Sequence, residues 1–110
     1  MPTRFVHNGT SIDYTPSSAV TAGDVIVQND LVGVAKRDIA ANVLGALAIA
    51  GVFDFPKSTA GGSAIAAGVT VYWNAGAQQA TATASGNKLI GKTVKAAADA
   101  DATVRVKLLQ

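Results

Sequence analysis

The residues whose spacing is most suggestive of chemistry lie in SGNKLIGKTV, residues 85–94. Gly86 is followed, after four residues, by Gly91, Lys92 and Thr93. This order matches G-x-x-x-x-G-K-[ST], the phosphate-binding loop in which backbone N–H groups and a lysine hold the phosphates of a nucleotide. Such a loop works because a buried strand delivers it to the N-terminus of a helix. The elements around the segment therefore decide whether the pattern can bind a nucleotide.

Those elements do not fit a phosphate-binding loop. Upstream lies ATATASGN, a polar alternating strand, where a parallel sheet would need a continuous apolar run. Downstream, residues 94–102 allow at most two helical turns before the β-like run TVRVKLL. We predict a hairpin instead, with its turn at residues 85–87. Leu89 and Ile90 then enter a strand, and Lys92 points outward.

The remaining polar residues form no catalytic or metal-binding pattern. His7 is the only histidine, and in a polar segment beside Asn8 and Gly9 it is expected to be a solvated or interface residue. The aspartates are scattered, no serine lies in a nucleophile-elbow pattern, and no metal-ligand spacing occurs. Cysteine is absent. We therefore predict no enzyme activity, no cofactor, no metal and no small-molecule substrate.

Composition limits the classes of partner. The 110 residues suit one domain, and the 49% hydrophobic content is mostly Ala and Val with only 5% aromatic residues. Such small side chains bury little area each, so burial against another copy or a larger partner would add stability. A net charge of +2 without a basic stripe argues against nucleic acid. The longest apolar run, residues 43–53, is broken by glycines and is too short to span a bilayer, so no membrane partner is expected.

Short β-like runs separated by Gly, Asn and Asp turns predict an all-β fold. The expected strands are 25–27, 31–35, 46–55, 69–73, 80–84, 89–94 and 103–109. Two Ala-rich segments, 38–44 and 96–102, are expected to form single helical turns, and KSTAGG, residues 57–62, an exposed flexible loop.

Together these elements predict a small single-domain β-barrel or β-sandwich, residues 19–110, with one or two short helical turns. It follows an extended N-terminal arm, residues 1–18, which contains one short strand near residues 5–7 or 11–14. Residues 19–27, AVTAGDVIV, also align with residues 64–72, AIAAGVTVY. This alignment suggests an internal pseudo-repeat of residues 19–55 and 64–109, in which Gly91 corresponds to Gly33. Chance similarity in a chain rich in Ala and Gly is the alternative.

Several segments together resemble a family of small bacteriophage and prophage proteins known as capsid cement or head decoration proteins. They are AGDVIVQNDLVGVAKRDIAANVLGALAIAGVFDFPK, AIAAGVTVYWNAG, ATATASGNKLIGKTV and DATVRVKLLQ, and they cover nearly the whole chain. Some members of this family are labelled as RecA-like recombinases, and the GNKLIGKT segment shows how such a label could arise.

The resemblance implies a structural virion protein with no catalytic residues. In this family, trimers of a compact β domain sit on the outside of an icosahedral head at local three-fold axes and join neighbouring major capsid proteins. Assembly takes place in the bacterial host cytoplasm. The partners implied are the major capsid protein and further copies of the same chain.

Candidate contact residues lie in the arm, in a charged turn and at the end of the most apolar strand. Phe53 and Phe55 are also candidates for the core, and the scarcity of aromatic residues favours the core. The full candidate set is Arg4, Phe5, His7, Asp13, Tyr14, Lys36, Arg37, Phe53 and Phe55.

Two other functions stay open at this point. The first is a nucleotide-binding recombination accessory protein that uses Lys92 and Thr93. The second is a β module of a phage tail or baseplate.

Overall fold

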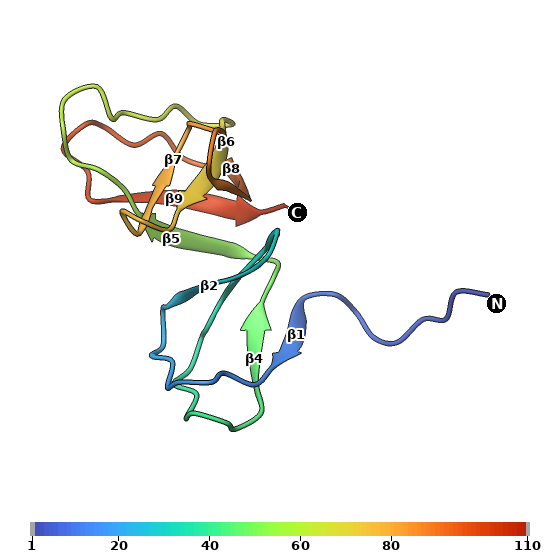
Figure 1. The fold of residues 1–110 in the computed structure, drawn as a ribbon. Coiled ribbons are helices and arrows are strands. Elements are labelled where there is room, and N and C mark those ends of the chain that lie inside the picture. Colours follow the sequence, from blue (N-terminus) through green and yellow to red (C-terminus); the bar gives the residue numbers. More distant parts are fainter. Residues whose placement is uncertain (1, 110) are drawn as a thin grey trace.

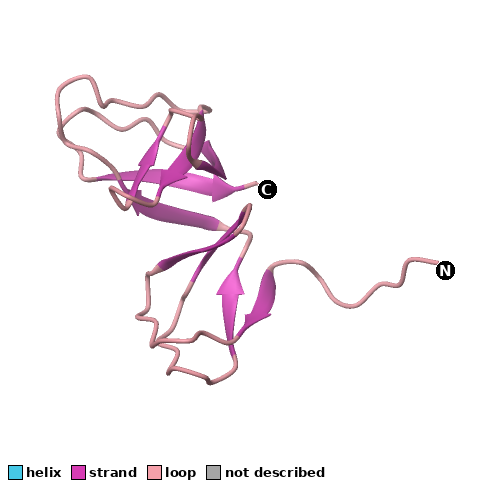
Figure 2. Cartoon of the chain, viewed as in Figure 1, coloured by secondary structure: helices cyan, strands magenta, loops and turns pink. Residues whose placement is uncertain are grey.

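The computed structural model describes residues 2–109, and within that range the chain is all-β without a helix (Figure 2). The strands are β1 (Ser11–Tyr14), β2 (Val25–Gln28), β3 (Leu31–Val34), β4 (Gly45–Ala48), β5 (Val52–Pro56), β6 (Thr70–Asn74), β7 (Gln79–Thr81), β8 (Lys88–Thr93) and β9 (Thr103–Leu108). The all-β prediction is confirmed.

The strands form two antiparallel sheets (Figure 1). Sheet 1 has the order β1-β4-β3-β2, and sheet 2 has the order β5-β9-β8-β6-β7. The two ends of sheet 2 approach each other where Lys57, just after β5, forms one parallel bridge with Ala80 of β7. A single bridge does not close a barrel, so the arrangement is compatible with the sandwich form of the prediction.

Residues 46–55 were predicted to form one strand. The chain instead passes from sheet 1 to sheet 2 within this segment. Strand β4 ends at Ala48 and β5 begins at Val52. Gly51 between them has φ of +112°, a conformation that residues with a Cβ rarely adopt. The prediction of one continuous strand is therefore wrong, because this glycine turns the apolar run into two strands of different sheets.

The two expected helical turns are also wrong. In residues 38–44, Ile39 forms an antiparallel bridge with Val20, and the N–H of Asn42 donates to the carbonyl of Pro16 at 2.7 Å. In residues 96–102, Ala97 forms the corresponding bridge with Ile65. These pairings with distant backbone groups take up hydrogen-bonding groups that a helical turn would use, and they outweigh the helix propensity of alanine.

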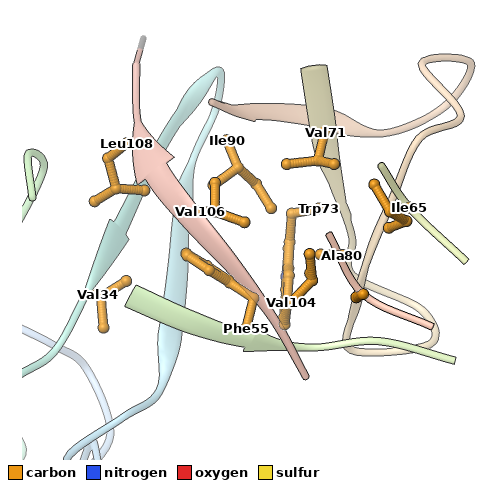
Figure 3. Close-up of a cluster of buried hydrophobic side chains, with 11 residues drawn as sticks. Val34, Phe55, Ile65, Val71, Trp73, Ala80, Ile90, Val104, Val106 and Leu108 are labelled. Carbon is orange, nitrogen blue, oxygen red and sulfur yellow. The ribbon is translucent and has the colours of Figure 1, made fainter. Parts of the chain in front are cut away.

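The main core is formed mostly by residues of sheet 2 and of its connecting loops (Figure 3). Phe55 of β5 and Trp73 of β6 meet edge to face, with ring centroids 6.0 Å apart and planes 62° apart. Sheet 1 contributes Val34, with Val25 and Val27 packed against the cluster. The full cluster is Val34, Phe55, Ile65, Val71, Trp73, Ala80, Ile90, Ala97, Val104, Val106 and Leu108.

A second, smaller cluster stabilises sheet 1 itself. It consists of Val20, Ala35, Ile39 and Leu47, with Ile12, Tyr14 and Ile26 packed against it. No side chain larger than Leu47 is fully buried there. Since burial of apolar area stabilises at about 25 cal/mol per Å², sheet 1 gains less from its own cluster than sheet 2 gains from the main core.

The two sheets repeat one connectivity, since β1-β4-β3-β2 corresponds to β5-β9-β8-β6 with β7 added at the end. The bridges Val20–Ile39 and Ile65–Ala97 occupy corresponding places. So do the backbone hydrogen bonds from Gly23 N to Ala35 O at 2.6 Å and from Gly68 N to Thr93 O at 2.8 Å. These correspondences support an internal duplication, which stays a proposal, but with other bounds than those predicted: β1 begins the first copy, and β5, which the bounds 19–55 put in the first copy, begins the second.

Candidate partner-binding surfaces

The segment that matches a phosphate-binding loop is a central strand of sheet 2. Strand β8 lies between β6 and β9, both antiparallel to it, and is followed by a bend, not a helix. Gly86 has φ of +76° in the preceding turn, where Asn87 N donates to Ala84 O at 3.1 Å. The turn and the strand that follows it are as predicted, but the hairpin is wrong: β7 before the turn pairs with β6, and β8 after it pairs with β6 and β9, so β6 separates the two strands. Without a helix N-terminus, the segment lacks the donors that would hold a phosphate.

The close packing of β8 against its neighbours explains why a glycine and a threonine occupy positions 91 and 93 of the GNKLIGKT segment. A Cβ at Gly91 would overlap Lys107 O and lie 2.7 Å from Leu109 N, both backbone atoms of or beside β9. The hydroxyl of Thr93 donates to Ala66 O at 2.7 Å and accepts from Val69 N at 2.9 Å. The side chain of Lys92 is exposed, on the face of the sheet away from the core. Gly91 and Thr93 therefore have structural roles, and the side chain of Lys92 faces solvent.

Residues 57–62 were predicted to form an exposed loop. This prediction is wrong for the first residue of the segment, because Lys57 is buried. Its side chain is only 4% exposed. The ammonium donates to Ser58 O at 2.6 Å, Ala98 O at 2.9 Å and Asp101 O at 3.0 Å, with Asp99 O at 3.2 Å and Ser63 Oγ at 3.4 Å. These carbonyls satisfy all three of its donors, so Lys57 joins the loop after β5 to the loop before β9.

A hollow of about 250 Å³ lies beside Lys57, lined also by Asn74, Gln79 and Thr81. The ammonium is already saturated by protein oxygens, so it offers no free donor to a ligand in the hollow. The burial of Lys57 could not be predicted from the sequence, because the oxygens around its ammonium come from two loops that lie about 40 residues apart along the chain.

The N-terminal arm carries three of the predicted contact residues. Arg4, Phe5 and His7 are all exposed, and the arm that carries them runs away from the sheets (Figure 1). Phe5 is 78% exposed and its neighbour Val6 is 76% exposed. Two adjacent large apolar side chains on an extended segment are typical of a binding segment that becomes ordered on its partner.

A groove of about 600 Å³ on sheet 1 brings together three more of the predicted residues, Asp13, Lys36 and Arg37. Asp13 comes from β1, and the two cations come from the turn after β3. The exposed side chains of Val43 (51%) and Leu44 (67%) also line it. Small residues on β1 and β4 leave this face of the sheet open, so the groove offers both apolar and charged contacts.

The three remaining predicted residues belong to the cores. Tyr14 packs against the sheet 1 cluster, and Phe53 is partly buried against the main core. Phe55 is 1% exposed and contacts Trp73, which fits the core interpretation and removes Phe55 from the surface.

Within residues 2–109, two ion pairs lie on the surface. Arg105 Nε donates to Asp54 Oδ1 at 2.9 Å across β9 and β5, and this hydrogen bond holds the pKa of Asp54 below its usual value of 3.8. Lys88 Nζ donates to Asp30 Oδ1 at 2.8 Å and lowers the pKa of Asp30 in the same way. The second pair connects the β2–β3 turn of sheet 1 to β8 of sheet 2.

Other site types find little support in the described part of the chain. Residues 2–109 gather no group of three or more His, Cys, Asp or Glu side chains suited to a metal ion. Within the same range there is no helix with the length and hydropathy to span a membrane.

Comparison with known families gives one match. A family model described as phage cement protein matches residues 6–108 of the 110-residue chain. No curated protein and no solved structure matches the chain.

Proposed function

The chain belongs to the phage cement protein family, and we propose that it binds the outer surface of the phage head as a homotrimer at local three-fold axes. There it joins neighbouring major capsid proteins and stabilises the shell. Family membership supports the capsid decoration role. The trimer, the axes, the outer surface and the major capsid protein as direct partner are part of the proposal.

The observation that carries the proposal is the exposed arm. Phe5 and Val6 are more than three-quarters exposed on a segment that extends away from both sheets. An arm of this kind has little to stabilise it in the free chain, and it gains buried apolar area when a neighbouring protein covers it. The groove at Asp13, Lys36 and Arg37 is a second surface for such contacts.

The proposed role is to hold the shell together, so the affinity for the head would come from many copies of the chain that bind at the same time. A trimer presents three arms and three grooves to the shell, and simultaneous weak contacts raise the overall affinity by effective concentration. Each contact can then stay weak, which fits a chain whose small side chains bury little area each.

The nucleotide-binding alternative has no support from the geometry of residues 85–94. That segment is a turn and an antiparallel strand. Calorimetry with ATP and Mg²⁺ tests the alternative directly: we expect no heat of binding, and a signal that Lys92→Ala abolishes would favour the enzyme.

Co-sedimentation with purified, expanded phage heads that lack the protein tests the proposed function. We expect saturable binding of the wild-type chain, and a free-protein mass in native mass spectrometry of three chains. A chain that stays in the supernatant at all concentrations would contradict the cement role, and a mass of one or two chains at micromolar concentration would contradict the trimer.

A further inference from the structure

The outer face of sheet 2 gathers four cations. In β9, Val104, Val106 and Leu108 are buried, so the alternating residues Arg105 and Lys107 point to the opposite, exposed face. Lys92 of β8 lies directly opposite Lys107 in the antiparallel register. Lys95 follows β8 and lines a hollow of about 250 Å³ together with Arg105 and Asp54. We call Lys92, Lys95, Arg105 and Lys107 the basic face.

The charges of the basic face are not balanced within the chain. Asp54 pairs with Arg105. Among residues 2–109, Lys92 and Lys107 have no carboxylate oxygen within the 4.0 Å of an ion pair. Side chains directly opposite in an antiparallel pair have Cβ atoms about 5 Å apart, and like charges there destabilise the sheet. The fold itself gains nothing from two lysines at these positions, since threonine or valine has a higher strand propensity.

Apolar side chains flank the cations on the same face. Val52 of β5 lies opposite Lys107 and is 52% exposed. Leu89 of β8 is 38% exposed and lies opposite Tyr72 of β6. A sheet face with cations at its centre and exposed aliphatic side chains around them is complementary to a protein surface that carries carboxylates among apolar residues.

We propose that the basic face docks onto an acidic protein surface of the phage head. Carboxylates of the shell would pair with Lys92 and Lys107 and remove the repulsion that the free chain carries. This inference rests on the proposed function and assigns to one face of sheet 2 the contact that the function needs. It also gives the lysine of the GNKLIGKT segment a role: Lys92 contacts a protein carboxylate, not a phosphate.

Two other occupants of the basic face are distinguishable by experiment. Acidic residues of a second copy would make the face part of the trimer interface. A nucleic acid would need a basic footprint that follows its phosphates, whereas here the apolar residues Val52 and Leu89 flank the cations. The charge of the face and its apolar flanks favour an acidic protein surface.

The test is the double variant Lys92→Thr with Lys107→Thr, bound to heads that lack the protein. We expect its thermal midpoint to equal or exceed that of wild type, because the like-charge pair is gone. Binding to heads is expected to weaken roughly tenfold, since each exposed ion pair lost weakens an interface by about threefold. Wild-type binding is expected to weaken as NaCl is raised from about 50 to about 500 mM, because salt screens exposed charges over this range. The variant is expected to lose most of that salt dependence.

The control is Ser17→Glu with Ser18→Glu, which lowers the net charge by the same two units at exposed positions next to sheet 1. This control variant is expected to bind heads within about twofold of wild type. Equal weakening in the control and in the lysine variant would overturn the proposal, because net charge and not the basic face would then set the affinity.

The remaining outcomes separate this proposal from the function on which it rests. Wild-type chain that fails to bind heads contradicts the cement role itself. Wild type and lysine variant that bind equally well leave the cement role intact and overturn the docking of the basic face. A lysine variant that loses its trimeric mass would place a second copy on the face, and wild-type binding to duplex DNA that the variant lacks would place nucleic acid there. Either result would overturn the proposal.

Discussion

Replacement of Gly91 by alanine is expected to disrupt sheet 2, and to cost more than the same replacement at Gly33 or Gly45, where the new Cβ would meet side-chain atoms first. The new Cβ would overlap Lys107 O and lie 2.7 Å from Leu109 N, so the obstacle is backbone that no side-chain rotation can move. Strands β8 and β9 would have to separate by about 1 Å. Hydrogen bonds such as that from Leu109 N to Ile90 O, now 3.0 Å long, would then be lost.

The magnitude follows from these losses. Overpacking of a close-packed site costs about 1–3 kcal/mol, and two ladder hydrogen bonds contribute about 1 kcal/mol each. The free energy of unfolding should therefore fall by about 3–5 kcal/mol, a large part of the 5–15 kcal/mol that is typical of a small domain. At about 4–8 °C per kcal/mol, the thermal midpoint falls by roughly 12–40 °C.

Urea unfolding followed by tryptophan fluorescence measures the effect, since Trp73 lies in the main core. Gly61→Ala is the matched control, because a Cβ there meets nothing within 4 Å, and it should change stability by less than about 0.5 kcal/mol. Gly86→Ala should fall between the two, since its φ of +76° costs about 1–2 kcal/mol in alanine although the space is open. Equal stability of the Gly91 and Gly61 variants would refute the strand register on which the account of this segment depends.

Three further predictions concern the buried lysine, an ion pair and the arm. Lys57→Met should lower the free energy of unfolding by about 2–4 kcal/mol because it leaves several loop carbonyls without a donor, whereas Lys36→Met, at an exposed site, should stay within about 0.5 kcal/mol in the same urea titration. Arg105 lowers the pKa of Asp54, so their pair stabilises the fold at neutral pH and the contribution is lost as the pH falls through the lowered pKa. Asp54→Asn should therefore lower the thermal midpoint at pH 7, and its difference from wild type should shrink in a pH series as the pH falls below 3.8, the ordinary pKa of an aspartate. Deletion of residues 2–9 should leave the thermal midpoint unchanged within error but weaken sedimentation with heads; a lower midpoint would show that the arm stabilises the free chain.

Local patterns predict the strands of this fold well where burial alternates along the chain. TVRVKL in β9 alternates exposed and buried residues from end to end, as the sequence pattern indicates. The turn before β8 was predictable because Gly86 and Asn87 favour such turns. In each case the signal lies within a few neighbouring residues, so it can be read without knowledge of the partner strand.

The wrong predictions concern features whose cause does not lie in neighbouring residues. The bridges of Ile39 and Ala97, the change of sheet at Gly51 and the burial of Lys57 all depend on segments far away in the sequence. An Ala-rich segment carries a helical preference of only a few tenths of a kcal/mol per residue, which one pair of bridging hydrogen bonds outweighs. A lysine at the start of a Gly- and Ser-containing segment gives no local sign that carbonyls from another loop will surround it.

The candidate contact surfaces were predictable only in part. The arm was identified from its polar sequence, and Lys36 and Arg37 as a charged turn. The groove that joins Asp13 to these two cations depends on the pairing of β1 with β4, and the basic face depends on the register of β8 with β9. The register of two strands cannot be deduced from the sequence of either strand alone. The sequence therefore could not predict that Lys92 and Lys107 lie side by side.

Cryo-electron microscopy of heads that lack the protein, imaged before and after addition of the wild-type chain, would locate the bound protein on the head. We predict new density on the outer surface at the local three-fold axes, with the exposed face of sheet 2 toward the shell. Unchanged maps at saturating protein, or density confined to the tail or baseplate, would contradict it.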